Sequence, residues 1–320
     1  MMSPSRRHGV TIIEMLVSVA VITLLVALLL PAVQNARDAA RRTQCRTHLQ
    51  QLGMAMELHH GVHGHYPTDG WGYRWIGDPD RGYGIDQPGG WVYNVLPFLQ
   101  YEVVRDMGRG KPEEEKREAL AGVLNMAMPI FHCPSRRSPT PYPYTSTTEL
   151  RNVDIPERAA KSDYAVNAGD TKLDTGGGPL SLEAEDVAAY EWPETKELTG
   201  ISYVRSQVRM GEVLDGLSNT YLIGEKYISH EQYTTGGTHG DDQSMFLGDD
   251  ADIRRWTTDA PLDDLVALDS REHFGSAHSG GCHFVFCDGS IRWIKYDIDL
   301  KVHQTLGNRK DRQWIPPGSF

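Results

Sequence analysis

The sequence predicts an α+β protein in which a long N-terminal helix, transmembrane and then amphipathic, packs on a globular domain with an antiparallel β-sheet. Residues 10–30 contain Glu14 as their only ionisable group, and apolar residues continue beyond them at helical spacing. Near the C-terminus, the alternating segment HFVFCDGSIRWIKY contains Asp288-Gly289, a pair typical of β-hairpin turns. These two observations set the fold class.

The apolar segment from Val10 to Leu30 comprises 21 residues. At about 1.5 Å per residue, a helix of this length crosses a bilayer once. The apolar run continues through Pro31 into an amphipathic sequence, without the cleavage site of a secretory signal peptide. We therefore expect a retained transmembrane helix.

Glu14 places a carboxylate within this apolar span. A carboxylate in hydrocarbon is costly unless it is neutralised or paired, so Glu14 is a functional candidate. Two explanations fit the residues: Glu14 reaches the lipid headgroups near the helix end, or it pairs with a cation. Cleavage after Gly9 would create such a cation, the amine of Val10, at a similar membrane depth.

The N-terminal motif, RRHG followed by VTIIE and a long apolar run, resembles the cleavage and methylation signal of type IV prepilins and type II secretion pseudopilins. Val10 replaces the usual Phe. The resemblance implies a pilin-like fold, cleavage between Gly9 and Val10 by a prepilin peptidase, and N-methylation of Val10 by the same enzyme. It also implies assembly with other pilin-like subunits, in which Glu14 of one subunit meets the amine of its neighbour.

The same resemblance implies the domain organisation and the location. The expected parts are a leader (1–9), a transmembrane part of the helix (10–33), its amphipathic continuation (34–65) and a globular domain of unassigned function (66–320). Basic residues flank the span on both sides, so charge alone does not orient it. The resemblance implies a single-pass protein of the bacterial inner membrane, with a cytoplasmic N-terminus and a domain in the periplasm or an extracytoplasmic filament.

The helix is expected to continue to about His60, because apolar residues recur every three or four positions from Leu49. Gly61, Gly64 and Pro67 would then end it. The following loop, 68–91, is rich in Gly and aromatic residues. It suggests either a binding surface or aromatic side chains that pack on their own domain.

Further elements are expected in order along the chain. WVYNVLPFLQ indicates a short helix or strand, KPEEEKREALAGVLNMAM a helix with an acidic start, and residues 171–200 an insertion or loop. DYAVNAG, ISYVRSQV and TYLIGEKYI indicate strands. For the C-terminal hairpin, a two-residue type I′ turn would place Phe286 opposite Ile291 and Phe284 opposite Trp293.

Later motifs resemble those of a large bacterial family of prepilin-like proteins whose globular domain has no assigned function. The most particular motif is His278, nine further residues, and then Asp288-Gly289. Others are RRTQC (41–45), LPFL (96–99), FHCPS (131–135), DYAVNAG (163–169), DGLSNT (215–220) and GE (224–225). The resemblance covers nearly the whole chain except the tail, NRKDRQWIPPGSF.

The chain has four cysteines: Cys45, Cys133, Cys282 and Cys287. They would pair only in an oxidising compartment, with three possible connectivities. We favour a disulfide between Cys45 and Cys133, which would tie the helix to the domain. Cys282 and Cys287 fall on opposite faces of one predicted strand, too far apart for a bond.

Metal sites have weak support in the sequence. His273, His278, Cys282, His283 and Cys287 carry zinc-binding groups, but neighbours on a strand face opposite sides and no CxxC or HExxH spacing is present. The histidines of HHGVHGH lack matching Cys or carboxylate ligands. Calcium is possible at Asp215 and Asp288, although turn chemistry explains both first. We expect no metal and no cofactor.

Catalysis and nucleic-acid binding are not expected. There is no GxSxG motif, and no Ser stands beside a His in a recognisable catalytic pattern. The formal net charge of −11 disfavours a nucleic-acid partner.

The sequence therefore predicts a structural subunit of a type IV pilus or a type II secretion-like pseudopilus. The subunit would be processed by a prepilin peptidase and assembled through its N-terminal helix. The alternative is a single-pass, membrane-anchored envelope module that binds a glycan or protein ligand through the aromatic loop from Trp71 to Trp91.

Overall fold

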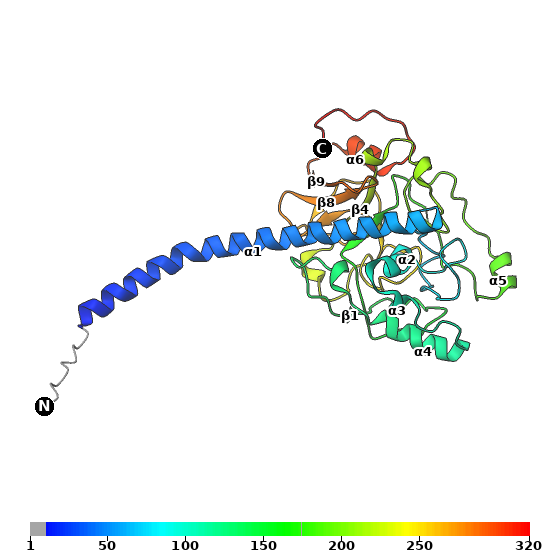
Figure 1. Cartoon of the computed structure of the whole chain (residues 1–320), viewed down its shortest axis with the longest axis horizontal. Coiled ribbons are helices and arrows are strands. Elements are labelled where there is room, and N and C mark those ends of the chain that lie inside the picture. Colours follow the sequence, from blue (N-terminus) through cyan, green and yellow to red (C-terminus); the bar gives the residue numbers. More distant parts are fainter. Residues whose placement is uncertain (1–10, 174) are drawn as a thin grey trace. The chain divides into compact units, whose positions relative to one another are not determined.

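The computed structural model describes residues 11–173 and 175–320 (Figure 1). The predicted cleavage site, Gly9 and Val10, lies outside the described residues. The chain divides into two compact units, one reaching to Thr43 and the other comprising Gln44–Phe320. The predicted α+β class is confirmed, with a long N-terminal helix and a largely antiparallel sheet.

The first helix, α1 (Ile12–His63), begins at a reciprocal cap. The Thr11 hydroxyl accepts a hydrogen bond from the Glu14 amide (3.3 Å), and the Glu14 carboxylate accepts one from the Thr11 amide (2.8 Å). Side chains from Ile12 to Leu30 are exposed, and α1 is long and apolar enough to cross a membrane. Pro31 lies inside the helix.

The part of α1 within the second unit buries one face. Its buried residues are Cys45, His48, Leu49, Leu52, Gly53, Ala55, Met56 and His59. The helix ends at Gly64, which adopts a left-handed φ of 79° and donates its amide to the His60 carbonyl (2.8 Å). The buried face thus reaches His59, next to the predicted end of the helix at about His60. The helix itself continues for about one further turn, to His63.

The central sheet has the strand order β5-β3-β4-β8-β9. Its strands are β3 (Tyr164–Asn167), β4 (Tyr221–Glu225), β5 (Arg254–Arg255), β8 (Gly281–Phe286) and β9 (Ile291–Lys295). All neighbouring pairs are antiparallel except β3 and β5. Two short pairs lie outside this sheet: β1 (Tyr142–Pro143) with β2 (Arg158–Ala159), and β6 (Leu262–Asp263) with β7 (Gly275–Ser276).

The other helices are short. The α-helices are α2 (Trp91–Val95), α3 (Glu102–Arg105), α4 (Glu113–Leu124), α5 (Ala184–Ala189) and α6 (Leu300–Gly307). The 3-10 helices are η1 (Leu96–Leu99), η2 (Pro129–Phe131), η3 (Met210–Glu212), η4 (Leu217–Asn219) and η5 (His230–Gln232). The acidic start of α4 is confirmed, whereas the strand predicted from ISYVRSQV is wrong, because residues 201–208 form turns and irregular structure.

The sheet carries a hydrophobic core on each face. On one face, Leu52 and Met56 of α1 join Ile223 and Val285 in the larger core. A Cβ added at Gly53 would lie 2.6 Å from a methyl of Val285, so α1 approaches β8 closely.

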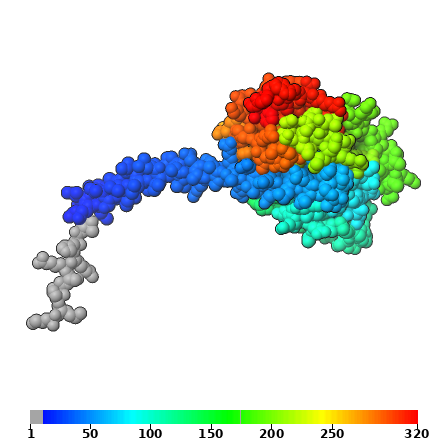
Figure 2. Space-filling view, turned by 45° about the horizontal axis from the view of Figure 1, so that its top comes forward, coloured from blue at the N-terminus to red at the C-terminus, as the bar shows by residue number. Residues whose placement is uncertain are grey.

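The second core lies on the opposite face of the sheet. It contains Phe284, Phe286, Ile294 and Leu306, the last from α6. The C-terminal tail, red in Figure 2, packs against the outer side of this core. Phe320 stacks on Phe286 with ring centroids 6.0 Å apart. The sheet is therefore covered on both faces.

The predicted register of the C-terminal hairpin is wrong by one residue. Val285, not Phe286, pairs with Ile291, and Phe284 pairs with Arg292. Val285 and Ile291 consequently lie on the side of the larger core, whereas Phe284 and Phe286 lie in the second.

The turn of this hairpin explains the difference. Phe286 donates its amide to the Ser290 carbonyl (2.9 Å), which leaves a three-residue connection. Within it only Gly289 has a positive φ, 77°, whereas a type I′ turn needs two such residues. Asp288 instead accepts a hydrogen bond from the Ser290 amide (2.9 Å), as turn aspartates commonly do.

Candidate functional site

The N-terminal site contains one described residue of the predicted processing group, Glu14. Its carboxylate lies in the first turn of α1 and accepts hydrogen bonds from the Thr11 amide (2.8 Å) and hydroxyl (2.9 Å). Glu14 is exposed within the single chain. The carboxylate therefore lies a few residues from the amine that cleavage before Val10 would create.

A second site lies in the interior of the second unit, where four side chains from separate segments meet. Cys45, Cys133, Glu225 and His278 are all buried, and one ligand atom from each lies within 4.8 Å of the others. The Cys133 sulfur is 3.8 Å from the His278 Nε2, and this nitrogen is 3.2 Å from the Glu225 Oε1. We call these four residues the Cys-His-Glu cluster.

Different elements position these four side chains. Cys45 lies on the buried face of α1, and Cys133 follows η2 after one residue. Glu225 is the last residue of β4, and His278 lies between β7 and β8. The cluster therefore connects α1 to the sheet and to two of its loops.

Glu225 directs its two carboxylate oxygens to different partners. The Oε2 accepts a hydrogen bond from the backbone amide of His283 (2.7 Å) and lies 3.3 Å from the Nδ1 of the same residue. The Oε1 has no aligned hydrogen-bond donor, although His278 is close. Burial opposes ionisation, but the two histidines outweigh it and hold the pKa of Glu225 well below its usual range.

His278 is the base that faces this carboxylate. Burial lowers its pKa, but contacts with Cys133 and Glu225 outweigh burial and raise the pKa to about 10. Burial raises the pKa of the Cys133 thiol well above its usual value. Cys133, Glu225 and His278 thus each alter the pKa of another member of the cluster.

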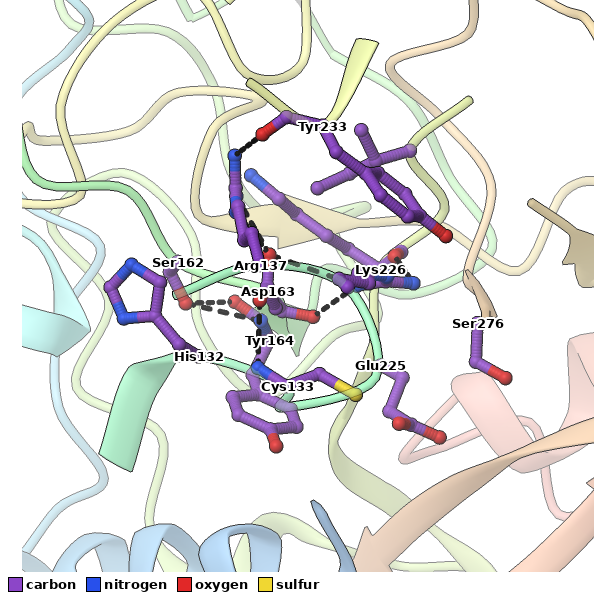
Figure 3. A network of polar contacts seen from close by, with 12 residues as sticks. His132, Cys133, Arg137, Ser162, Asp163, Tyr164, Glu225, Lys226, Tyr233 and Ser276 are labelled. Carbon is purple, nitrogen blue, oxygen red and sulfur yellow. Dashed lines mark hydrogen bonds and ion pairs between the residues drawn. The ribbon is translucent and has the colours of Figure 1, made fainter. Parts of the chain in front are cut away.

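A buried ionic network fixes the loop that carries Cys133 (Figure 3). The Asp163 carboxylate accepts the Cys133 amide (2.7 Å) and pairs with Arg137 (2.7 Å). Arg137 also pairs with Asp241 (2.5 Å), which in turn pairs with Lys226 (2.9 Å). These opposite charges pair with one another, and through Asp163 they hold the backbone of the Cys133 loop.

Comparisons with protein-family models give two matches. Residues 4–30 match the prokaryotic N-terminal methylation motif, and residues 34–301 match a protein family of unknown function, DUF1559. The chain belongs to the DUF1559 family. Together the matches confirm a type IV pilin-like protein with a cleavage and methylation signal. No curated protein and no solved structure matches this chain.

The DUF1559 match includes all four residues of the Cys-His-Glu cluster. Neither matched family description names an enzymatic activity. The sequence motifs RRTQC, FHCPS, GE and His-x9-Asp-Gly each contribute one residue to the cluster. Sequence reasoning noticed each motif separately and missed that they meet.

The ends of the His-x9-Asp-Gly motif have different surroundings in this DUF1559 protein. His278 precedes β8 and belongs to the cluster, whereas Asp288 and Gly289 form the turn after the strand. A Cβ at Gly289 would lie 3.1 Å from the carboxylate of Glu57 on α1. The motif therefore spans β8, with a buried histidine at one end and a turn at the other.

Cys45 and Cys133, the two residues of the predicted disulfide, lie close together in the structure, with their sulfurs within 4.8 Å. Cys45 and Cys133 are both free thiols in the structure, so the bond is not formed there, and it stays a prediction. Cys282 and Cys287 lie in different cores, on opposite faces of the sheet as expected.

The considered zinc-binding group around His278 is not assembled among the described residues. Cys282 is buried in the second core, and His273 contacts Ser270 (2.5 Å between the ring Nδ1 and the hydroxyl). His283 contacts Glu225 instead of a sulfur. Only His278 of that group belongs to the cluster.

The two aspartates considered for calcium take part in separate turns. Asp215 accepts hydrogen bonds from the amides of Asp311 (3.0 Å) and Arg312 (2.6 Å), and Asp288 accepts one from Ser290. The structure tests neither the expected absence of a metal nor the alternative of calcium at these two residues.

The aromatic loop does not present its tryptophans as a binding surface. Trp71, Trp75 and Trp91 are at most 1% exposed. The Trp75 indole donates to the Pro179 carbonyl (3.1 Å), and the Trp91 indole donates to the Ile253 carbonyl (2.8 Å). Of the two interpretations of this loop, packing within the domain applies to these three residues.

A polar pocket of about 570 Å³ lies elsewhere in the second unit. Its lining includes Tyr73, Asp242, Arg254 and Trp256. Burial, with a further contribution from the Asp252 charge, raises the pKa of Asp242 to about 7. This pocket suits a polar ligand better than an apolar one.

Proposed function

We propose that this DUF1559 protein is a structural subunit of a type IV pilus or a type II secretion-like pseudopilus, anchored in the bacterial inner membrane before assembly. One observation carries the proposal: the methylation motif at residues 4–30 includes the exposed, apolar beginning of α1, which holds Glu14 in its first turn. A helix exposed along its apolar length suits a bilayer first and a bundle of like helices afterwards.

Glu14 would guide the assembly of these helices. In hydrocarbon, its carboxylate is most stable beside an opposite charge, and the amine of Val10 becomes that charge after cleavage. A neighbouring subunit that places its amine beside Glu14 satisfies both groups and sets the axial register of the two helices. The second unit would then remain outside the helical core of the filament.

The test replaces the carboxylate without removing the membrane span. Glu14→Leu should insert into the membrane as the wild type does and fail to enter filaments. The measurement is the amount of subunit recovered in sheared or detergent-resistant filaments relative to the membrane fraction. The loss should be at least tenfold.

Ser18→Ala provides the matched control. Ser18 lies one turn further along the same span and donates its hydroxyl to the Glu14 carbonyl of its own helix (2.7 Å). It should assemble normally. Normal filament recovery for Glu14→Leu would refute the pairing of Glu14 with a neighbouring amine.

The second candidate function is a membrane-anchored envelope module that binds a ligand. The buried tryptophans of the aromatic loop do not support it, but the polar pocket beside Tyr73 and Trp256 does. Such a module needs neither cleavage nor assembly. An unprocessed chain that never enters filaments would favour it.

A further inference from the structure

We propose that Cys45, Cys133, Glu225 and His278 bind one Zn²⁺ ion inside the second unit. The site would be structural and would fasten α1 to the sheet. This inference is independent of filament assembly, since all four residues belong to the second unit of a single chain.

The spacing of the donor atoms supports a four-coordinate ion. Bonds of about 2.0 to 2.3 Å in a tetrahedral arrangement keep neighbouring donors roughly 3.3 to 3.8 Å apart. The His278 nitrogen lies 3.2 Å from the Glu225 oxygen and 3.8 Å from the Cys133 sulfur. All four donors lie within 4.8 Å of one another, so small side-chain movements complete the arrangement.

The Glu225 carboxylate provides an independent observation that points to a ligand. Glu225 is fully buried, and its Oε1 faces the cluster without an aligned hydrogen bond. Its Oε2 is already held by the His283 amide (2.7 Å). The oxygen without an aligned hydrogen bond is thus the one that faces the His278 Nε2 (3.2 Å), and a metal ion between the two would use both as ligands.

Neighbouring groups hold the backbone of two ligands in place. The Cys133 amide donates to Asp163 (2.7 Å). The His278 amide donates to the Ser276 hydroxyl (3.0 Å), and the His278 carbonyl accepts the Tyr296 hydroxyl (2.8 Å). Such supporting hydrogen bonds are typical of metal sites, because they orient the ligands before the ion binds.

The donor set selects the ion and the role. Two sulfurs with one imidazole and one carboxylate favour Zn²⁺ over Mg²⁺ or Ca²⁺, which prefer oxygen ligands. Four protein donors leave no coordination position for a substrate, which is typical of structural zinc. Binding would displace the thiol protons and link segments from four parts of the chain.

Zinc and a disulfide are mutually exclusive at this site. A bond between the sulfurs of Cys45 and Cys133 would remove both thiolates and leave only Glu225 and His278. Reduced protein should therefore bind zinc, and protein with that bond should not.

The experiment uses the full chain purified in detergent. The protein is reduced, stripped with a chelator, and loaded with Zn²⁺ alone, after which bound metal is measured by elemental mass spectrometry. The wild type should retain one zinc per chain and unfold at a higher temperature when zinc is added. Loading with Co²⁺ should give the near-ultraviolet absorption of cobalt–thiolate bonds.

Three variants locate the ion. Cys133→Ser and Glu225→Gln should lower the zinc affinity at least tenfold, and Cys133→Ser should also weaken the cobalt–thiolate absorption. Cys282→Ser is the matched control, because it removes a buried thiol from the other face of the sheet. It should retain one zinc per chain.

Circular dichroism establishes that each variant is folded. If Cys133→Ser does not fold, Glu225→Gln, which nearly preserves side-chain volume, carries the test with the zinc-dependent shift in unfolding temperature. The proposal is overturned if reduced wild-type protein retains no zinc, or if Glu225→Gln binds zinc as tightly as the wild type and the Cys282→Ser control do. Native protein that contains a mapped Cys45–Cys133 bond and takes up no zinc after reduction would also overturn it.

Discussion

His303 is a fully buried histidine in the second core, beside Phe274 and Phe284. Its Nδ1 lies 3.2 Å from the Tyr221 hydroxyl, and its Nε2 has no hydrogen-bond partner. Burial lowers its pKa to about 3; nearby His273 adds to the decrease and Asp259 opposes it. His303 is therefore neutral in the folded protein over the physiological pH range.

This burial predicts a loss of stability in mild acid. The unfolded chain protonates His303 near pH 6.5, whereas the folded chain does so only near pH 3, so stability falls as the pH decreases between these values. The contribution approaches about 1.4 kcal/mol per pH unit. Replacement with Gln should remove it, as measured by the free energy of urea unfolding at pH 7 and pH 4.5.

The control for this prediction is His230→Gln, which replaces an exposed histidine. It should keep the pH dependence of the wild type. Equal pH dependence in His303→Gln and the wild type would contradict the assignment to His303.

At the scale of secondary-structure elements, α1 and β8 pack closely because Gly53 has no side chain. A Cβ at this position would lie 2.6 Å from a Val285 methyl, closer than real contacts allow. This close contact between helix and sheet thus occurs at a glycine inside a helix, where glycine is otherwise unfavourable.

Gly53→Ala should destabilise the protein by about 1–3 kcal/mol, because the added methyl forces α1 away from β8. Gly61→Ala is the matched change on the same helix, with open space around the added methyl. It should be neutral or stabilise by up to about 1 kcal/mol, since alanine favours the helix. Chemical denaturation of both variants checks the difference, and equal stabilities would contradict the close-packing explanation.

Elements with a strong local pattern could be predicted from the sequence, and those set by distant contacts could not. The spacing of Leu49, Leu52 and Met56 correctly indicated the buried face of α1. For the C-terminal hairpin, Asp288-Gly289 marked the turn, but the register depended on which strand face meets α1. The turn has three residues instead of two, so Val285, which packs against α1, pairs with Ile291.

At the scale of the whole molecule, the Cys-His-Glu cluster could not be predicted because no two of its residues are near each other in the sequence. Cys45, Cys133, Glu225 and His278 come from segments that only the complete fold brings together. The N-terminal site is the opposite case, since cleavage and methylation signals are read along a short, continuous segment. Its motif was accordingly recognised from the sequence and confirmed by the match to residues 4–30.

The intact protein provides the first measurement to make on this N-terminal signal. Native protein isolated from membranes should begin at Val10 and carry one methyl group on its amine. Intact mass and N-terminal sequencing together measure both properties. A chain that retains Arg6 and Arg7 would contradict prepilin processing and favour the membrane-anchored binding module.

The packing of α1 on β8 can form only late in the synthesis of the chain. Ribosomes release Leu49, Leu52 and Met56 long before β8 (Gly281–Phe286) exists, so the contacts of this apolar face with β8 form only after most of the chain has been made. Uncovered apolar faces associate with other apolar surfaces and lead to aggregation. We expect the part of this face that β8 covers to depend on a membrane or a chaperone for protection until the C-terminal strands have been made.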